Sequence, residues 1–281
     1  MSVFEALILG VVQGITEFLP ISSSGHLVLL QKIFGITEPA LVFDTAVHGG
    51  TLIAVLVVLR WDVWNILRRI VQPLTLCLII GTIPAVIAAL LFKDRIEEAF
   101  ASASFLGFAF LITSGLLLAS DLLFRGSSKP GGLPARLDGP APVRTQDEMN
   151  LVDALFIGLL QAVAIVPGIS RSGATISAAL FRRLDRDFAA RFSFLLSIPA
   201  ILGALILQIK NLAGAGASAG AGSIGLLPIA VGSLSACIVG FFSIRLTLKI
   251  VREHSLRGFA LYTGILGLLV LLDQFAVHFF F

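Results

Sequence analysis

The stretches ALILGVVQ at residues 6–13 and ISSSG at residues 21–25 recur without a gap as ALFIGLLQ at 154–161 and ISRSG at 169–173. The two copies lie 148 residues apart and share eight identical positions. In each copy a proline separates an apolar run from a hydroxyl-rich turn. Interrupted helices at corresponding places in two halves of a hydrophobic chain are typical of a binding site inside a membrane. The repeat therefore predicts two similar halves with a polar site where their broken helices meet.

The composition indicates an integral membrane protein. Hydrophobic residues make up 57% of the 281 residues and charged residues only 13%, with a mean hydropathy of +1.00, whereas a soluble domain carries about 25% charged residues. The net charge of +3 gives no indication of a nucleic-acid partner. Cys77 and Cys237 lie apart in apolar runs and predict neither a disulfide framework nor a metal motif. Glu5 near the start, without a basic leader, argues against a cleaved signal peptide.

The apolar segments predict an all-α polytopic membrane protein. A helix needs about 20 apolar residues to cross the hydrocarbon core. Six segments qualify, at residues 41–60, 73–92, 104–124, 188–209, 224–245 and 258–279. Two further pairs are too short and interrupted to cross, at 3–19 with 24–34 and at 152–166 with 174–181. Each is predicted to be a re-entrant helix pair, because backbone freed by Pro and Gly at that depth must be covered by protein or line a wet cavity.

The basic residues predict an orientation. Fifteen Lys and Arg residues fall on one face. The opposite face keeps four, which are Lys32, Lys93, Arg95 and Lys210. The positive-inside rule makes the richer face cytoplasmic. Each half has three predicted crossings, and an odd number of crossings makes the second half start on the opposite side of the membrane from the first. Residues 1–124 and 151–281 are therefore predicted to be two inverted-topology repeats. Together they form one membrane domain, 1–281.

A polar linker is predicted between the halves. Residues 125–150 combine several Pro and Gly with mixed charges, which indicates a mobile cytoplasmic segment. A second Gly/Ala/Ser-rich stretch, residues 213–223, is predicted to be a loop at the far surface.

The first helix break carries ionisable side chains at a depth in the membrane where burying a charge costs free energy. Gln13 and Glu17 are four residues apart and share one helical face, and PISSSGH at residues 20–26 follows. A carboxylate and an imidazole at membrane depth should each have a partner and a role. Plainer alternatives stay open: Glu17 exposed at the interface, His26 bonded to a neighbouring carbonyl, and Gln13 as a packing amide.

The second break, PGISRSGAT at residues 167–175, places Arg171 among hydroxyls at a helix start. An Arg at the centre of a membrane helix costs at least about 2.5–3.5 kcal/mol. Its planar fork suits phosphate or carboxylate, and a helix N-terminus adds amide donors. The alternative is a structural ion pair with Glu17 that joins the halves. Only the anion-binding alternative needs the surrounding hydroxyls, which would bind the phosphate. These hydroxyls belong to Ser22, Ser23, Ser24, Ser170, Ser172 and Thr175.

Asp44 and His48 form a further polar pair at the start of the first predicted crossing. Their spacing of four fits a metal ligand or a proton carrier that extends the site. It fits equally well a polar cap on the helix.

A carboxylate, an Arg, a His and hydroxyls at crossing helix ends suit phosphoryl chemistry, in which cations hold the transferred group and a nucleophile attacks in line. One Arg would leave a diphosphate under-neutralised. We therefore expect Glu17 to bind a divalent cation, with Gln13 and Asp44 as further candidate ligands.

Two long motifs carry a resemblance to a known family. The first motif is QGITEFLPISSSGH at residues 13–26. Its pattern is a Glu or Gln (here Gln13), a Glu four residues later, Phe-Leu-Pro, and a Ser-rich turn that ends in Gly-His. The second motif, at 167–175, is Pro-Gly-x-Ser-Arg-Ser followed by a Thr, and Ile-Pro-Ala occurs at 83–85 and 198–200. These residues resemble the bacterial undecaprenyl-diphosphatase family of the bacitracin-resistance type, over nearly the whole chain.

The resemblance implies hydrolysis of the C55 isoprenoid diphosphate to its monophosphate, which recycles the lipid carrier of cell-wall precursors and gives bacitracin resistance. It also implies a site open to the outer face of the bacterial cytoplasmic membrane and a requirement for Mg²⁺ or Ca²⁺. Carried over by position, Glu17 is a catalytic or metal-binding carboxylate with Gln13 as its partner, Ser23 and His26 are nucleophile candidates, and Arg171 is the phosphate clamp. Many members have Glu at position 13, and the Gln found here cannot act as a base.

Three nucleophiles stay open: Ser23, His26 and a metal-bound water. The rival function is a transporter or flippase of the lipid phosphate or another anion, because inverted repeats with broken helices are transporter architecture. A transporter needs no nucleophile, so the His and Ser residues beside Glu17 favour the enzyme. The expected partners are a polyprenyl diphosphate lipid and the membrane, with no nucleic acid; the sequence also allows a homodimer.

Overall fold

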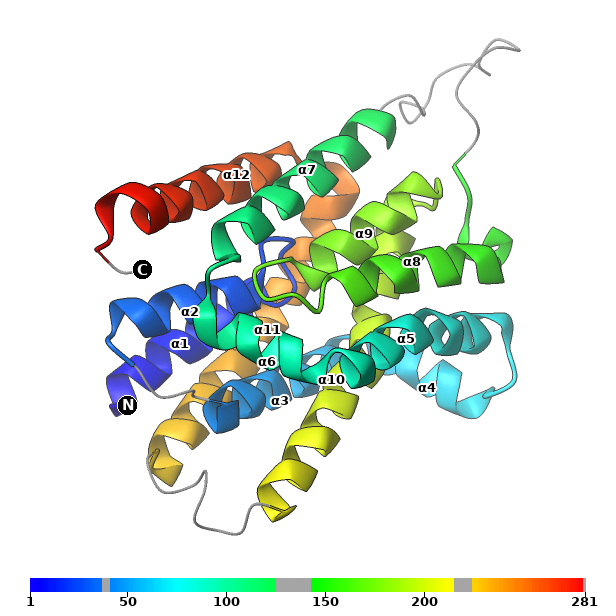
Figure 1. The fold of residues 1–281 in the computed structure, drawn as a ribbon. Coiled ribbons are helices and arrows are strands. Elements are labelled where there is room, and N and C mark those ends of the chain that lie inside the picture. The colour runs from blue at the N-terminus through cyan, green and yellow to red at the C-terminus, as the bar shows by residue number, and fades with distance from the viewer. Residues whose placement is uncertain (37–40, 125–142, 215–223, 280–281) are drawn as a thin grey trace.

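The structure, a computed structural model, describes residues 1–36, 41–124, 143–214 and 224–279. In these ranges the chain folds into a bundle of helices without a β-strand (Figure 1). An isolated β-bridge joins Arg144 to Leu184. The predicted all-α class is confirmed.

Five helices of the described chain are long and apolar enough to cross a membrane. They are α5 (Pro73–Leu91), α7 (Leu106–Phe124), α10 (Arg186–Gly214), α11 (Leu226–Glu253), and α12 (Arg257–Leu272) continued by the π-helical turn η2 (Asp273–Val277). A sixth span requires α3 (Leu41–Val58) and α4 (Arg60–Arg68) to be taken together, and these two helices are bent by 77°. The crossing predicted at residues 41–60 therefore ends as a helix at Val58, and the chain bends before α4 begins at Arg60. The chain turns where the polar residues of α4 begin, because that helix has an apolar and a charged face and no buried residue.

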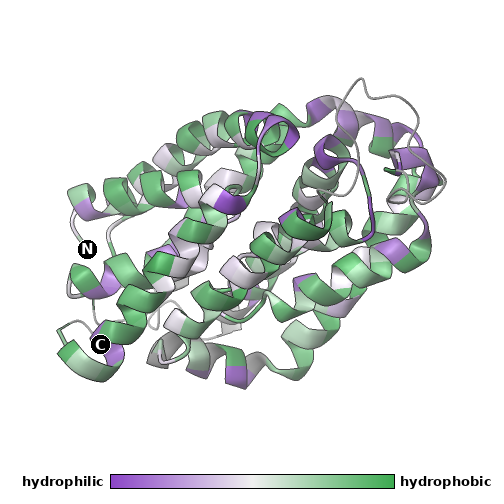
Figure 2. Cartoon of the chain, turned by 90° about the horizontal axis from the view of Figure 1, so that it is seen from above, coloured by the Kyte–Doolittle hydropathy of each residue, from purple (hydrophilic) through white to green (hydrophobic). Residues whose placement is uncertain are grey.

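The exposed surface of these helices is hydrophobic. Side chains such as Ile79, Leu90 and Phe242 are 53%, 66% and 63% exposed, as expected of residues that face lipid. Figure 2 shows hydrophobic colouring along most of the helix lengths, with hydrophilic residues gathered mainly near helix ends. The chain is thus a multi-pass membrane protein.

Four shorter helices form the two broken pairs. They are α1 (Val3–Thr16) with α2 (Ser23–Ile33), and α8 (Leu151–Val163) with α9 (Arg171–Phe181). Both α1 and α8 begin with a capping box, at Ser2 with Glu5 and at Asn150 with Asp153. Within each pair the two helices contact each other.

Glycines of the repeat explain how the halves pack. Helix α1 packs against α11 of the other half, and α8 packs against α5 (Figure 1). A Cβ added to Gly10 would lie 2.2 Å from the carbonyl oxygen of Gly232, and one added to Gly158 would lie 2.5 Å from that of Gly81. Only glycine allows backbones this close, as is common between membrane helices. The first helix of each half thus packs against a long helix of the other half, as expected of two equivalent halves. The inversion of the halves across the membrane stays a prediction.

Most of the predicted linker, residues 125–142, lies outside the described residues, as do residues 215–223 of the second predicted loop. Residues 143–150 are anchored. Arg144 donates its backbone N–H to the Arg183 carbonyl at 2.8 Å and accepts from Asp185 at 2.8 Å. A 3₁₀ turn, η1 (Gln146–Glu148), follows. Residues 143–150 of the predicted linker therefore contact the second half directly.

Two fully buried aspartates gather Arg residues of the predicted cytoplasmic face. Asp153 pairs with Arg144 at 2.7 Å and with Arg182 at 2.6 Å. The hydrogen bond to Asp153 raises the pKa of Arg144. At the end of α7, Asp121 pairs with Arg186 at 3.0 Å and with Arg257 at 3.1 Å. These basic residues thus lie at helix ends or, for Arg144, in the segment before η1, and buried carboxylates bind them to the bundle. The remaining helix, α6 (Lys93–Ser102), connects α5 to α7.

Candidate active site

The two breaks are hydrogen-bonded to each other. Ser24 accepts from the backbone N–H of Gly168 at 3.3 Å, and Ser172 donates to the carbonyl of Leu19 at 3.0 Å. The α1–α2 turn therefore touches the α8–α9 turn although about half the chain separates them. The junction brings together side chains that the sequence analysis selected from both motifs.

Glu17 lies at the centre of this junction and is 5% exposed. Its Oε1 pairs with Nη2 of Arg171 at 2.6 Å. Its Oε2 accepts from Ser23 Oγ at 2.5 Å and from Gln13 Nε2 at 3.0 Å. A buried carboxylate is tolerated when it is paired and hydrogen-bonded in this way. The predicted alternative of a Glu17 exposed at the interface is wrong, whereas the Glu17–Arg171 ion pair is present.

Ser23 and Arg171 occupy the same position in the two copies of the repeat. Each follows a serine N-cap, since Ser22 accepts from Gly25 N–H at 3.2 Å and Ser170 accepts from Gly173 N–H at 3.0 Å. Each is the first residue of a new helix, α2 or α9. The copies build the same serine cap and helix start, and at the residue after the cap one supplies a hydroxyl and the other a guanidinium.

The other predicted phosphate hydroxyls are engaged with protein. Ser22 and Ser170 cap their helices, and Ser24 and Ser172 join the two breaks. Thr175 Oγ1 donates to the Arg171 carbonyl at 2.9 Å and lies 2.6 Å from Ser193 Oγ. These hydroxyls shape the turns around Glu17, and their role as phosphate ligands stays a prediction.

His26 is adjacent to the centre in sequence but has other partners. Its Nδ1 lies 2.6 Å from the Ser22 carbonyl oxygen, and its Nε2 lies 2.7 Å from the hydroxyl of Tyr262 on α12. The ring stacks on Tyr262, at 5.7 Å between centroids and 7° between planes, and meets Phe110 edge-on. The plainer alternative for His26, a bond to a neighbouring carbonyl, is what the structure shows.

The side chains of Asp44 and His48 have different partners. His48 Nε2 lies 3.6 Å from Oε2 of Glu17, while its Nδ1 lies 2.6 Å from the backbone carbonyl of Asp44. The carboxylate of Asp44 accepts from Gln31 Nε2 at 2.7 Å. His48 therefore borders the centre directly, and the Asp44 side chain is directed to Gln31.

The donor set partly fits a divalent cation. The described residues contain no group of three or more His, Cys, Asp or Glu side chains arranged to hold a metal. Beside Glu17, however, Oε1 of Gln13 is buried and has no hydrogen-bond partner. A carboxylate and an amide oxygen are hard donors, and Mg²⁺ is often held by one or two carboxylates together with substrate phosphates. Glu17 and Gln13 fit a cation that the substrate's own oxygens would complete.

Four polar neighbours of the site lie outside both sequence motifs and were not predicted: Ser193, Thr113, Gln31 and Tyr262. Ser193 lies on α10, and its carbonyl is 3.5 Å from Arg171 Nη1. Thr113 on α7 accepts from the Ser170 N–H at 3.0 Å. Each is a polar residue within or beside an apolar run, and that signal alone could have marked it. Which break each one faces depends on helix packing, which the linear sequence does not contain.

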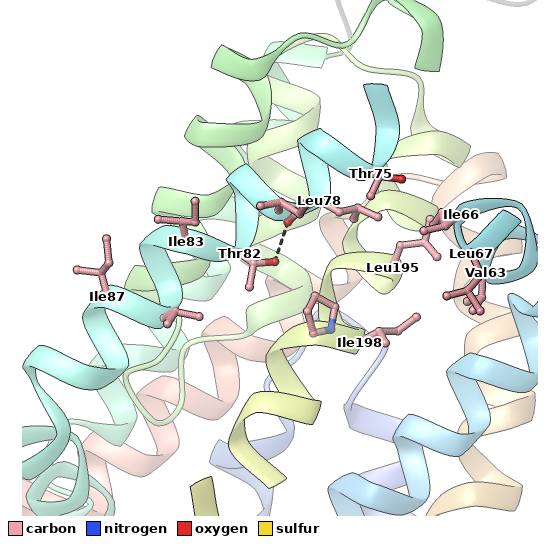
Figure 3. A pocket seen from close by; sticks show the side chains of 13 residues that line it. Val63, Ile66, Leu67, Thr75, Leu78, Thr82, Ile83, Ile87, Leu195 and Ile198 are labelled. Carbon is pink, nitrogen blue, oxygen red and sulfur yellow. Dashed lines mark hydrogen bonds between the residues drawn. The ribbon is translucent and has the colours of Figure 1, made fainter. Parts of the chain in front are cut away.

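A separate cavity lies away from this centre (Figure 3). It has a volume of about 470 Å³ and opens between α4, α5 and α10. Its lining is apolar apart from Thr75 and Thr82, and the latter hydroxyl donates to the Leu78 carbonyl at 2.7 Å. Ile83 and Ile198 of the two Ile-Pro-Ala motifs both line it. This lining offers no charged group for phosphate, so the cavity is not the candidate active site.

Fold and site together define a multi-pass membrane protein in which a buried carboxylate binds a guanidinium and a hydroxyl where two broken helices meet. Comparison with known families matches residues 6–269 to the family described as "Bacitracin resistance protein BacA". The chain belongs to this family.

Relatives named undecaprenyl-diphosphatase are similar over their full length. The protein of Carboxydothermus hydrogenoformans is 43% identical over 279 residues, covering 99% of this chain and 100% of the relative. "Undecaprenyl-diphosphatase 3" of Bacillus cereus is 42% identical, covering 98% of each chain. The Halothermothrix orenii undecaprenyl-diphosphatase is 38% identical, covering 97% of this chain and 98% of the relative.

Proposed function

We propose that this protein hydrolyses undecaprenyl diphosphate to undecaprenyl phosphate and inorganic phosphate, and so confers resistance to bacitracin. Family membership and the names of the full-length relatives support this function, and they do not favour the transporter alternative. The observation that carries it is the 2.5 Å hydrogen bond from Ser23 Oγ to the buried Glu17 carboxylate, beside Arg171. A hydroxyl in contact with a carboxylate base is the arrangement of an activated nucleophile.

Substrate binding uses the guanidinium of Arg171. In the structure Arg171 neutralises Glu17. The terminal phosphate competes for the same guanidinium, whose planar fork matches two phosphate oxygens. When Arg171 turns to the phosphate, Oε1 of Glu17 is released, while Oε2 keeps its hydrogen bond to the Ser23 hydroxyl.

The first chemical step is attack by Ser23 on the terminal phosphorus. The Ser23 oxygen forms the new O–P bond, Glu17 takes the hydroxyl proton, and the bond from that phosphorus to the bridging oxygen breaks. Undecaprenyl phosphate leaves with that oxygen and the bond's electron pair. Arg171 stabilises the negative charge on the transferred group.

The second step releases inorganic phosphate. Water attacks the phosphoserine, the O–P bond to Ser23 breaks, and the proton held by Glu17 returns to the Ser23 oxygen. The water oxygen forms the new O–P bond, and both of its protons leave on the released phosphate, which passes one of them to solvent. The site is thereby restored.

Glu17 and Gln13 would hold a divalent cation, Mg²⁺ or Ca²⁺. Such an ion supplies charge neutralisation for the diphosphate oxygens. The unpartnered Oε1 of Gln13 supports this assignment.

We also propose that the chain lies in a bacterial cytoplasmic membrane with the site open to the outer side. Arg182, Arg186 and Arg257 gather at helix ends, with Arg144 in the segment before η1, and this supports a cytoplasmic side on the face opposite the site opening.

The test is phosphate release from undecaprenyl diphosphate by purified protein in detergent. Ser23→Ala and Glu17→Gln should each lose at least about a thousandfold in kcat, as expected for a nucleophile and its base. Ser114→Ala is the matched control, because Ser114 donates only to a backbone carbonyl, that of Ala260 on α12. No phosphate release by the wild type, or wild-type turnover by Ser23→Ala, would overturn the proposal.

A further inference from the structure

The turn before Ser23 is strained. Ser22 has φ +73° and ψ 95°, a backbone conformation that residues other than glycine rarely adopt. The equivalent Ser170 has φ −70° and ψ 116°, an ordinary extended conformation. Both serines cap a helix in the same way, so capping does not require the strain. Strained backbone persists only where surrounding contacts hold it.

His26 supplies such a contact. The carbonyl of Ser22 accepts from the His26 backbone N–H at 3.2 Å and lies 2.6 Å from the side-chain Nδ1. A carbonyl oxygen only accepts, so Nδ1 carries a hydrogen. The residue equivalent to His26 in the second copy is Ala174, which has no polar side chain. The extra bond therefore occurs in the copy that is strained.

Tyr262 in turn fixes His26. With hydrogen on Nδ1, the neutral ring has its lone pair on Nε2, and the Tyr262 hydroxyl 2.7 Å away donates to it. The parallel stacking of the two rings restricts the imidazole further. Tyr262 is the only tyrosine of the chain, and it belongs to α12, far from the motif in sequence. Both ring nitrogens of His26 are thus engaged, and neither faces Glu17.

We propose that Tyr262 and His26 are positioning residues, which hold the strained Ser22 turn and thereby direct the Ser23 hydroxyl at Glu17. The contacts run from the Tyr262 hydroxyl to Nε2, from Nδ1 to the Ser22 carbonyl, and from Ser22 to the neighbouring Ser23. This assigns His26 a role through the backbone in place of attack on phosphorus. It rests on the proposed function in one respect, that Ser23 is the nucleophile.

The first test replaces His26 by Asn, Gln and Ala. An Asn amide N–H can reach the Ser22 carbonyl as Nδ1–H does, whereas Gln places its amide nearer the position of Nε2. The kcat of His26→Asn should exceed that of His26→Gln and His26→Ala by roughly tenfold, the ratio expected from keeping one hydrogen bond, with KM similar in all three. A His26→Asn variant that folds and is as inactive as His26→Ala would show that His26 itself touches the reacting atoms and would overturn the proposal.

The second test is independent of turnover. Diethyl pyrocarbonate acylates an unprotonated, accessible imidazole nitrogen, and mass spectrometry resolves the four histidines of the chain. Tyr262→Phe removes the hydroxyl, so acylation of His26 should become several-fold faster while that of His48 is unchanged. Leu261→Ala, beside Tyr262 and 66% exposed, is the matched control and should leave His26 protected.

Equal His26 acylation in wild type and Tyr262→Phe would overturn the assignment of Tyr262. If the protein released no phosphate from the lipid diphosphate but Tyr262→Phe still exposed His26, the contacts would stand and the proposed function would fail. The two failures are therefore distinguishable.

Discussion

Ser23 and Arg171 hold the same place in the two copies of the repeat, and their side chains bind the two oxygens of a single carboxylate, that of Glu17, at 2.5 and 2.6 Å. The repeat thus delivers a hydroxyl and a guanidinium from two similar helix starts to one acid. The difference between the copies at this position, serine against arginine, is what makes the junction chemically asymmetric.

Replacing Arg171 by Lys should lower kcat/KM about 10- to 100-fold, because an ammonium cannot reproduce the two-pronged contact with phosphate. Phosphate release from undecaprenyl diphosphate measures this. Arg191→Lys is the matched control, since Arg191 forms half-exposed ion pairs with Asp187 and Asp62. Near-normal turnover of Arg171→Lys would make the Glu17–Arg171 pair structural only.

Chelation with EDTA should abolish phosphate release, and adding Mg²⁺ or Ca²⁺ should restore it. Gln13→Glu should lower the cation concentration needed for half-maximal activity, because a carboxylate is a stronger ligand for a hard cation than an amide. A cation titration of wild type and variant measures the difference. Full activity in EDTA would remove the cation role from Glu17 and Gln13.

Gly158→Ala should destabilise the protein by roughly 1–3 kcal/mol, because the added methyl would meet the Gly81 backbone of α5. Thermal unfolding in detergent reports the change. The control is Gly115→Ala in α7, where a Cβ meets nothing within 4 Å. An unchanged melting temperature for Gly158→Ala would contradict the close packing of α8 on α5.

A cysteine at position 146, in a background without Cys77 and Cys237, should react only with reagents that reach the cytoplasm. Gln146 is exposed and lies in the anchored segment beside Arg144, on the face predicted to be cytoplasmic. Whole cells treated with a membrane-impermeant maleimide, before and after permeabilisation, give the measurement. Labelling of intact cells would reverse the predicted orientation.

The sequence predicts the helical class and the two breaks well, because apolar run length and Pro or Gly punctuation are local signals. It also marks Glu17 and Arg171 as functional, since charges at membrane depth are costly, with their ion pair as one of two alternatives for Arg171. The 77° bend between α3 and α4 is a detail that length and hydropathy do not determine.

The side-chain partners of the hydroxyls could not be predicted in the same way. Ser22 and Ser170 cap helices, and Ser172 bonds the Leu19 carbonyl, which depends on how the two turns approach each other. His26 has a role that only the packing of α12 reveals, because Tyr262 is 236 residues away along the chain. Non-local contacts of this kind leave no periodicity in the sequence.

Rapid acid quench of the wild-type protein, mixed with undecaprenyl diphosphate labelled with ³²P in the terminal phosphate, tests the central claim most directly. We predict transient label on the protein, located by mass spectrometry at Ser23 and absent from Ser23→Ala. Stoichiometric phosphate release with label on His26, or with no protein label and with kcat unchanged in Ser23→Ala, would contradict the account.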